Sequence, residues 1–578
     1  MGKWNRLIPG KDLSEWAWFF GPCALLIIPF VVYVKSNTYP IMTPETLWIL
    51  FGFFLAGIFL GILGQMGAVL RALTFAATLT LLIDVQTRWF IDYSLHQYIW
   101  IPIGLYALAL MSPEFIRTFA LVTVYATLVA VLVTPQSQPI QVAEFDAKLS
   151  GKNMLASGDR PNTIWIHIIV DEQIGIESIP VEFDGHHRLA NRLKSDYISD
   201  GFTVYGRAFS HFPQTIMSLP NILNLSNQHP KNFLSSSLGE AGSFWLTQSN
   251  YFDRLRRQGF DIHVYSMDFF RTCDPRRLGL IKSCYTYRAN SIWGLSETSL
   301  SKSNKAFLML RIYARLSKVY DKLVTVFDID GHFSLPRSVG PLVSLKVFDR
   351  FRKDVLKAEL GSVWLIHIPL PHDPYALNRD CSIKNLPWLE NGEDSDLYQM
   401  NSVGARRANY SHYLEQVECV NQQLQSLFDA LKSSGSYDKA HIVVHGDHGS
   451  RIGTHNLRHR PSYRQDFRPS AENMVDVFGT LFAYKPPGSS AGTYRREMES
   501  VSALLDKVSA GRANDRENGE DDPVAYLVEW SDEACQGSIS DMTQGCRLLP
   551  VTMPNFSYGK VETEKSSELR GELETVPP

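Results

Sequence analysis

Four short segments of this 578-residue chain carry residue types suited to metal and phosphoryl chemistry. In the most distinctive one, Asp447 and His448 follow an apolar run at residues 442–444 and are flanked by Gly446 and Gly449. A carboxylate and an imidazole can bind one divalent metal. Ligands of open α/β sheets bind at the carboxyl ends of the strands, which is where this pair is expected to lie. Because Asp-His-Gly also occurs in ordinary loops, the other three segments decide its meaning.

A second segment places two acids at the end of a predicted strand. Residues 163–170 are mostly apolar and rich in β-branched side chains, which is typical of a buried parallel strand, and Asp171 and Glu172 follow directly. The two acids are either a solvated strand end or metal ligands at the same sheet edge. Neighbours on a strand point to opposite faces, but a turn at this point would let both carboxylates reach one metal.

The third and fourth segments add a hydroxyl and an imidazole. Thr215 lies in a turn before a predicted helix, and Ser218 follows three residues later. A helix N-terminus suits an anion and an activated oxygen nucleophile, although either residue could equally be an ordinary N-cap. Residues 363–370 form another apolar strand, and the loop after it carries His372.

In this order and spacing, the four segments resemble the alkaline phosphatase–sulfatase superfamily. They are most similar to its membrane-anchored branch, the phosphoethanolamine transferases and the lipoteichoic acid synthase-type phosphoglycerol transferases. The Thr-x-x-Ser-Leu-Pro pattern at residues 215–220 is similar to the nucleophile segment of the phosphoethanolamine transferases, and residues 447–449 resemble the superfamily's late metal motif. The resemblance extends over residues 162–488.

The resemblance implies one or two bound divalent metals, with Zn favoured and Mn as the alternative, and a nucleophile at Thr215. His459 is favoured over His455 as a substrate-binding residue, because it lies 11 residues after His448. The complete set comprises the metal ligands Asp171, Glu172, Thr215, Asp447 and His448, and the substrate-binding or proton-transferring residues His372, His455 and His459.

Two departures from the family patterns bear on the chemistry. The transferases carry a lone Glu at the first motif, whereas this chain has Asp171 and Glu172, closer to the paired acids of sulfatases. The sulfatase Cys-x-Pro-x-Arg or Ser-x-Pro-x-Arg segment, whose first residue becomes formylglycine, is missing; residues 214–218 stand there instead. This favours phosphoryl chemistry on Thr215 over sulfate hydrolysis.

The first 134 residues are predicted to form a membrane domain of five transmembrane helices. Five apolar segments with almost no charge follow one another, although the third and fourth are short for a hydrocarbon core that needs about 20 residues. A cleavable signal peptide would leave one such stretch. The segments are residues 16–34, 47–63, 68–83, 99–111 and 119–133.

The distribution of basic residues predicts the orientation of this domain. If the five helices alternate, most Lys and Arg residues of the loops fall on one side, which is the cytoplasmic side. An odd number of crossings then places everything after residue 134 outside the cytoplasm. The chain is therefore expected to be a multi-pass protein of a bacterial inner membrane with an extracytoplasmic catalytic domain.

After the membrane domain we expect a linker, a catalytic domain and an extension. Residues 135–161 are polar, with a surface helix at 146–155. Strand and helix patterns alternate over residues 162–488, which predicts an α/β sandwich of alkaline phosphatase/sulfatase type with a mostly parallel sheet. Residues 489–578 form a C-terminal extension with a disordered tail. Within the catalytic domain, residues 303–327 predict a basic amphipathic helix that lies on a membrane surface or packs on the soluble core.

Six of the seven cysteines lie in the part predicted to be extracytoplasmic, an even number that suits disulfides. Six cysteines allow 15 pairings. Cys273 with Cys284, and Cys535 with Cys546, would each close a short loop. No Cys-x-x-Cys motif is present, which argues against a cysteine metal cluster.

Together these features predict a metal-dependent transferase. It takes phosphoethanolamine or phosphoglycerol from a phospholipid donor, holds it on Thr215 and passes it to an extracytoplasmic glycan or lipid acceptor. The alternatives are a sulfatase- or phosphodiesterase-type hydrolase, and an inactive metal-binding sensor on the same fold. The net charge of −3 and the lack of a basic block do not suggest a nucleic-acid partner.

Overall fold

A computed structural model of the chain was analysed. It describes residues 13–87, 95–112, single positions between 114 and 129, and then 138–145, 160–236, 244–273, 280–314, 338–389, 403–452, 470–513, 523–529 and 547–561. Residues 146–155, most of 119–133, both His455 and His459, the Cys535–Cys546 pair and the tail from 562 were subjects of predictions and lie outside these ranges.

The chain divides into two compact units, each described here by itself. The first comprises residues 1–139, 290–339 and 385–388. Its helices are α1 (Leu13–Ser36), α2 (Pro44–Gln65), α3 (Ala68–Thr87), α4 (Leu95–Met111) and α9 (Lys302–Ala314), with the short 3-10 helix η5 (Ile292–Leu295).

Two of these helices are long and apolar enough to cross a membrane, over Phe19–Ser36 and Pro44–Gln65. The third and fourth contain shorter apolar stretches, at Ala68–Leu81 and Pro102–Met111. The described residues therefore bear out helices at four of the five expected segments, and membrane-spanning length at two. The count of five crossings stays a prediction.

Helix α9 belongs to the first unit, although it lies in the middle of the predicted catalytic sequence. The ring of Tyr313 packs against three aromatic rings of α1 and α2, with centroid distances of 5.2, 5.0 and 6.4 Å to Phe30, Tyr33 and Phe53. The Ser291 hydroxyl donates a hydrogen bond to Asn37 Oδ1 at 3.1 Å. Of the region predicted as one helix over 303–327, the part that the structure describes belongs to the first unit and packs on α1 and α2, so the expected packing on the soluble core is not found there, and a position on a membrane surface stays a prediction.

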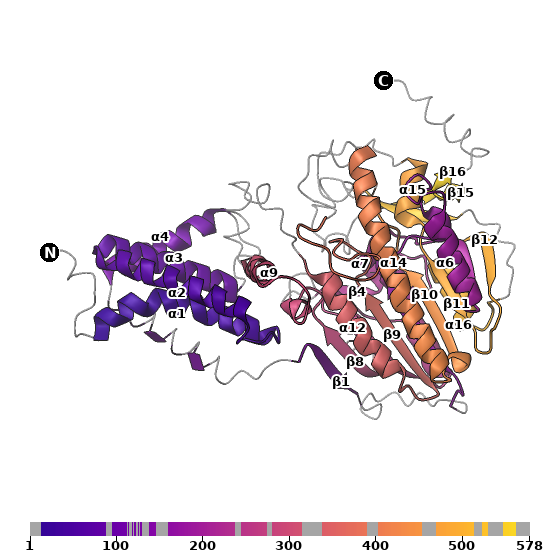
Figure 1. The fold of residues 1–578 in the computed structure, drawn as a ribbon, viewed down its shortest axis with the longest axis horizontal. Coiled ribbons are helices and arrows are strands. Elements are labelled where there is room, and N and C mark those ends of the chain that lie inside the picture. Colours follow the sequence, from indigo (N-terminus) through magenta and orange to yellow (C-terminus); the bar gives the residue numbers. More distant parts are fainter. Residues whose placement is uncertain are drawn as a thin grey trace, which may run out of the picture. The chain divides into compact units, whose positions relative to one another are not determined.

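The second unit comprises residues 140–289, 340–384 and 389–578, and a nine-stranded sheet runs through it. The strand order is β1-β8-β6-β9-β2-β10-β11-β3-β12 (Figure 1). Neighbouring strands are parallel from β8 to β10 and again at β3 and β12, which confirms the mostly parallel sheet. The strands are β1 (Ile140–Glu144), β2 (Ile164–Val170), β3 (Thr203–Phe209), β6 (Asp261–Met267), β8 (Ile281–Tyr287), β9 (Ser362–Ile368), β10 (Ala440–Gly446), β11 (Phe482–Lys485) and β12 (Thr493–Ser500).

The three central strands, β9, β2 and β10, are buried along almost their whole length because helices cover both faces of the sheet. Figure 1 shows α6, α12 and α14 across one face. Residues of α7, α8 and α16 share a core with the side chains on the other face, among them Trp165, Val363 and Val443. The helices are α6 (Arg188–Ser199), α7 (Thr215–Leu223), α8 (Asn250–Arg257), α12 (Gly340–Val355), α14 (Val403–Ser433), α15 (Ala471–Phe478) and α16 (Val501–Ser509), with 3-10 turns η3 (Ile176–Ser178), η4 (Pro230–Asn232) and η6 (Tyr437–Lys439).

Segments outside the expected catalytic range also join this sheet. Strand β1, from the predicted linker, pairs antiparallel with β8, and β12 pairs with β3 beyond the expected end at Gly488. Smaller sheets are formed by β4 (Leu234–Ser236), β5 (Phe244–Leu246) and β7 (Phe270–Arg271), by β13 (Val524–Glu529) and β14 (Arg547–Thr552), and by β15 (Phe556–Ser557) and β16 (Lys560–Val561).

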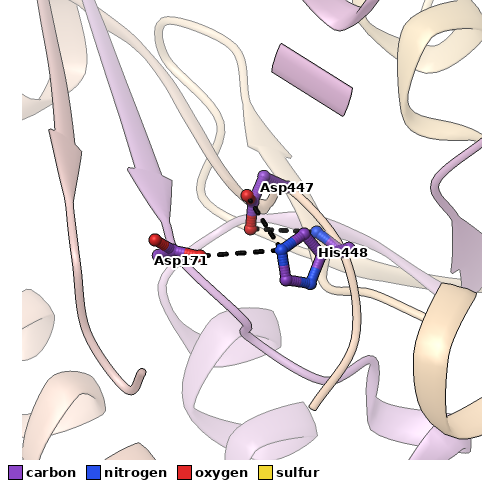
Figure 2. A group of neighbouring side chains, drawn as sticks. All are labelled: Asp171, Asp447 and His448. Carbon is purple, nitrogen blue, oxygen red and sulfur yellow. Dashed lines mark hydrogen bonds and ion pairs between the residues drawn. The ribbon is translucent and has the colours of Figure 1, made fainter. Parts of the chain in front are cut away.

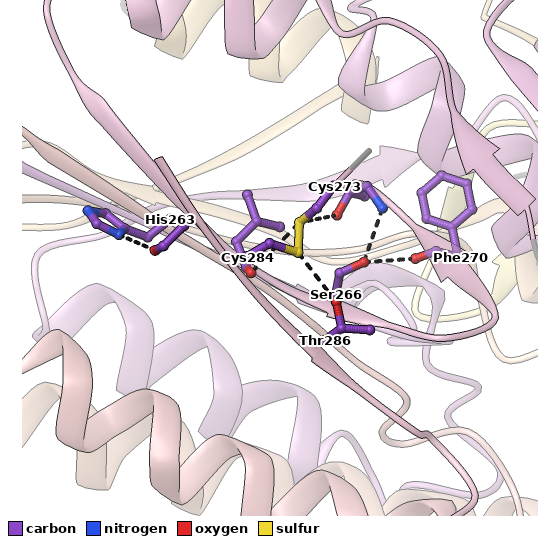
Figure 3. The surroundings of a disulfide bond; sticks show 9 residues. His263, Ser266, Phe270, Cys273, Cys284 and Thr286 are labelled. Atoms are coloured by element: carbon purple, nitrogen blue, oxygen red, sulfur yellow. Dashed lines mark hydrogen bonds between the residues drawn. A yellow bond between two sulfur atoms is a disulfide. The ribbon is translucent and has the colours of Figure 1, made fainter. Parts of the chain in front are cut away.

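Two disulfides staple the second unit. Cys273 and Cys284 are bonded, as predicted, beside Ser266 and Thr286 (Figure 3). Cys381 and Cys419 form a bond that the sequence did not single out. The described part of the chain has one free cysteine, the buried Cys23 of α1.

Candidate metal and nucleophile site

Strand register brings the first pair of carboxylates together. Strands β2 and β10 are adjacent and parallel, with Val170 opposite Gly446. The next residues, Asp171 and Asp447, therefore leave the sheet side by side at its carboxyl edge. Both are buried, with 4% and 0% of their surface exposed, so their charges have little access to water. This is the convergence of acids that the sequence predicted.

Thr215 lies between the acids and the imidazole as the first residue of α7. Its Oγ1 is 3.3 Å from Asp171 Oδ1 and 3.3 Å from His448 Nε2. Ser218, one turn further along, is fully buried, and its hydroxyl has no hydrogen-bond partner among the described residues. The geometry thus brings Thr215, and not Ser218, to the acids.

His448 is held with one ring nitrogen facing the carboxylates. Its Nδ1 is 2.9 Å from the Gly449 carbonyl oxygen. This nitrogen therefore carries the ring proton and donates a hydrogen bond to that oxygen. Nε2 is left as a lone-pair donor, 3.3 Å from Asp447 Oδ2 and 3.7 Å from Asp171 Oδ1. Figure 2 shows the two carboxylates and the ring pointing toward one another.

These residues fit a divalent metal. One ligand atom from each of Asp171, Asp447 and His448 lies within 4.8 Å of the others. Asp447 Oδ1 accepts the backbone N–H groups of Glu172 and His448, both at 3.0 Å, whereas Oδ2 is buried and has no hydrogen-bond partner in the described chain. Two carboxylates and one imidazole suit Zn or Mn.

The electrostatics of the site point the same way. Burial raises the pKa of the Asp447 carboxyl to about 7. Burial also raises the pKa of Asp171, and the nearby charge of Asp447 adds to this effect. Two anions this close and this far from water repel one another, and a bound cation would offset that repulsion.

Glu172 lies in a different group of side chains from Asp171. Its carboxylate forms an ion pair with Arg451, and Oε1 lies 3.5 Å from His372 Nε2. A second set of possible ligands consists of Glu172, His372 and Asp373. The structure thus brings Glu172 and the predicted substrate-binding His372 to the site's border but leaves Glu172 outside the group around Asp171.

His372 is one-third exposed, in the loop after β9. Burial opposes its charged form, but Asp373 and Asp171 outweigh burial and raise the pKa of His372 to about 9. The ring is therefore an imidazolium at neutral pH. His455 and His459, the other two predicted substrate-binding residues, lie outside the described chain.

Two residues near the site were missed by the sequence reasoning. His367, in β9 beside β2, has Nε2 3.7 Å from Asp171 Oδ2, and burial lowers its pKa to about 4. A histidine inside an apolar strand next to a motif-bearing strand was the available signal. Arg451 gave no such signal, because its ion pair with Glu172 depends on the conformation of the backbone, which the sequence pattern does not show.

The second unit is thus an α/β domain that carries a metal-type group of side chains and a hydroxyl at the carboxyl edge of a mostly parallel sheet. The model of the Sulfatase family matches residues 353–469. The matched segment lies within residues 162–488, where the motifs indicated that superfamily, and the match agrees with them. A search of curated proteins gave no match.

Several solved structures are similar at low identity. One is a phosphonate monoester hydrolase of Agrobacterium radiobacter, 13% identical over 72% of this chain and 94% of that one, with a TM-score of 0.42. Another is the C-terminal periplasmic domain of EcEptC from Escherichia coli, in complex with Zn, 13% identical over 67% and 88%, with a TM-score of 0.35. A third is a putative sulfatase from Bacteroides thetaiotaomicron, 11% identical over 72% and 91%, with a TM-score of 0.41.

Proposed function

We propose that this protein is a membrane-anchored, metal-dependent transferase of phosphorylated head groups. It takes phosphoethanolamine or phosphoglycerol from a phospholipid, holds it on Thr215 and passes it to a hydroxyl of an extracytoplasmic glycan or lipid. The observation that carries the proposal is the position of Thr215 Oγ1, 3.3 Å from both a carboxylate and an imidazole of the metal-type group.

The residues of the site have separate tasks in this reaction. Asp171, Asp447 and His448 would hold the metal, which when bound supplies a Lewis acid that lowers the pKa of a hydroxyl and offsets phosphoryl charge. The N-terminus of α7 places Thr215 where backbone N–H groups favour an anion. His372, as an imidazolium, can hold a phosphate oxygen or protonate the leaving group.

Bonds and protons balance over two steps. In the first, Oγ1 of Thr215 attacks phosphorus as its proton passes to Asp171 Oδ1, which accepts its hydrogen bond, while the bond from phosphorus to the diacylglycerol oxygen breaks and His372 protonates that oxygen. In the second, the acceptor hydroxyl attacks the phosphorus of phospho-Thr215 and gives its proton to the neutral His372, the bond to Oγ1 breaks, and Asp171 returns the proton to Thr215. Both are in-line displacements that depend on positioning and charge stabilisation.

Two features of the chain support an anchored, extracytoplasmic location. Helix α2 exposes Trp48, Phe51 and Phe59, at 57%, 61% and 61%, along a face that a bilayer would cover. The two disulfides suit an oxidising compartment outside the cytoplasm. A phospholipid donor would explain why a soluble-type domain carries a membrane anchor.

The second candidate is an ester hydrolase, which transfers the phosphoryl or sulfuryl group to water. The match to the Sulfatase family supports this candidate. The missing formylglycine segment argues against sulfate esters in particular. The two reactions share the metal site and differ in whether a group accumulates on Thr215 for an acceptor hydroxyl or is passed to water.

The test is to incubate the purified full-length protein with a phospholipid labelled in its head-group phosphate and to look for label on Thr215 by mass spectrometry. We expect Thr215→Ala to lose labelling by on the order of 10³-fold, as removal of a covalent nucleophile does. Ser218→Ala is the matched control and should keep it. Label that persists in Thr215→Ala would overturn the assignment. An unlabelled parent that releases inorganic phosphate or sulfate from a soluble ester would favour the hydrolase.

A further inference from the structure

A buried ion pair borders the proposed site, and neither member has a task in the mechanism above. Arg451 and Glu172 are 3% and 1% exposed. Both have a positive φ, 58° and 61°, which is a backbone region that residues other than glycine rarely adopt. A chain that places two long charged side chains at such positions holds them against a conformational cost.

Arg451 connects three segments that carry the site. It lies three residues after His448, its guanidinium pairs with Glu172, and its Nη1 donates to the Pro213 carbonyl at 3.5 Å. Pro213 lies two residues before Thr215, and Glu172 directly follows Asp171. One guanidinium therefore contacts the segments of all four residues around the proposed metal.

Contacts of its backbone and of one carboxylate oxygen hold Glu172 in the orientation that meets Arg451. Its N–H donates to Asp447 Oδ1 at 3.0 Å, and its carbonyl accepts the hydroxyl of Tyr413 at 2.5 Å. Its Oε1 lies 3.5 Å from His372 Nε2. Arg451 and His372 both meet Oε1, whereas Oε2 is buried and has no hydrogen-bond partner among the described residues.

We propose that Arg451 and Glu172 are a positioning pair, in which Arg451 keeps Glu172 away from the metal and fixes the Thr215 turn against the Asp447–His448 segment. In this proposal Glu172 binds the side chains of Arg451 and His372 and is not a metal ligand. This inference rests on the proposed function for its catalytic part, whereas its metal-binding part stands on the site alone.

The first measurement is metal affinity, with Zn²⁺ and Mn²⁺ titrated separately into the metal-free full-length protein. Loss of a partner outside the ligand set typically costs 10- to 100-fold in affinity. We expect Glu172→Gln to weaken binding by less than about 100-fold and Asp447→Asn by more. Arg451→Met should leave affinity unchanged or raise it, because it frees a carboxylate. A loss in Glu172→Gln as large as that in Asp447→Asn would make Glu172 a ligand and overturn the proposal.

The second measurement is the rate of Thr215 labelling. A displacement of about 1 Å in an aligned site can cost on the order of 10²-fold in rate, and we expect Arg451→Met to show a loss of this size in kcat with KM little changed. Arg451→Lys keeps the charge opposite Glu172 but lacks the planar fork that also reaches Pro213, so it should keep metal affinity and recover only part of the rate. Full activity in Arg451→Met would refute the positioning role.

Two controls separate this pair from general stability and from the proposed function. Lys507→Met removes a comparably buried cation, paired with Glu499 at 2.5 Å in the same unit, and should change neither measurement. The double variant Glu172→Gln/Arg451→Met should lose less than the product of the single losses. If the parent is never labelled, the transferase proposal fails, and the metal titrations still decide whether Glu172 is a ligand.

Discussion

Replacing Asp447 by Asn should stabilise the metal-free protein and destabilise the metal-bound one. The change keeps the shape of the side chain, and the amide oxygen can still accept the N–H groups of Glu172 and His448 that Oδ1 accepts at 3.0 Å. It removes a negative charge that lies buried beside Asp171. The two effects on stability have opposite signs, which makes the prediction sharp.

The magnitude follows from the raised pKa of Asp447, about 7 compared with an ordinary value of 3.8. At 1.36 kcal/mol for each tenfold change in proton affinity, burying the ionised carboxylate costs on the order of 4 kcal/mol. Because the folded-state pKa of this acid is raised, the cost is absent below pH 3.8, grows as pH rises toward about 7 and is complete above it. The new amide N–H group, if unpaired, costs about 1–3 kcal/mol in return. A net gain of roughly 1–3 kcal/mol at pH 8 is therefore expected for metal-free Asp447→Asn.

Bound metal should invert this order. A ligand present at 1,000 times its Kd stabilises the folded state by about 4.1 kcal/mol, which exceeds the gain expected for the metal-free variant, and Asp447→Asn should lose most of that stabilisation. The assay is urea unfolding of the full-length protein at pH 5 and pH 8, with Zn²⁺ and with a chelator, followed by hydrogen exchange of the β10 amides. If the chelated parent is more stable than chelated Asp447→Asn at pH 8, or if Zn²⁺ shifts both equally, the account of the site is refuted.

Three further predictions concern the rest of the chain. A Cβ on Gly57 would lie 2.4 Å from the Cα of Cys23, so Gly57→Leu should separate α1 from α2 and lower the thermal midpoint, whereas the open Gly52 tolerates the same change. Replacing Cys381 and Cys419 by Ser removes a cross-link of separation 38, and the loop-entropy relation predicts a loss of about 4 kcal/mol in urea unfolding; an unchanged midpoint would contradict it. A reporter protein fused after residue 488 should be active only if it is of a kind that works outside the cytoplasm. Activity of a reporter that works only in the cytoplasm would contradict the extracytoplasmic position of this part of the chain.

The central features of the fold were predictable because the sequence encodes them locally. Continuous apolar runs mark the strands before Asp171 and Asp447, and parallel strands deliver their carboxyl ends to one edge, so the convergence of these acids follows from pattern alone. The short Cys273–Cys284 loop was predictable for the same reason.

Other features depend on geometry that sequence patterns do not carry. The pairing of Glu172 with Arg451 depends on a left-handed backbone conformation at both residues. A glycine at these positions would have indicated that conformation in the sequence, but Glu and Arg do not. Cys381 and Cys419 are separated by 38 positions and meet only once the loop after β9 has folded against α14. The apolar side of α9 predicted that this helix packs against other elements, but the sequence pattern did not indicate that these elements are α1 and α2.

The docking of residues 290–314 on helices of the membrane unit has a consequence for release of the catalytic unit. The chain passes from one unit to the other near residue 140, again near 290 and 340, and once more at each end of residues 385–388. A protease cut between residues 145 and 160 would therefore sever one connection and leave the others intact, so the catalytic unit should stay with the membrane fraction. The two ends of the long insertion are close, since the N–H of Val339 donates to Asn290 Oδ1 at 2.9 Å. Release of the second unit should therefore require that the linker be cut, that residues 291–338 be excised and their ends rejoined by a short turn, and that residues 385–388 leave the first unit.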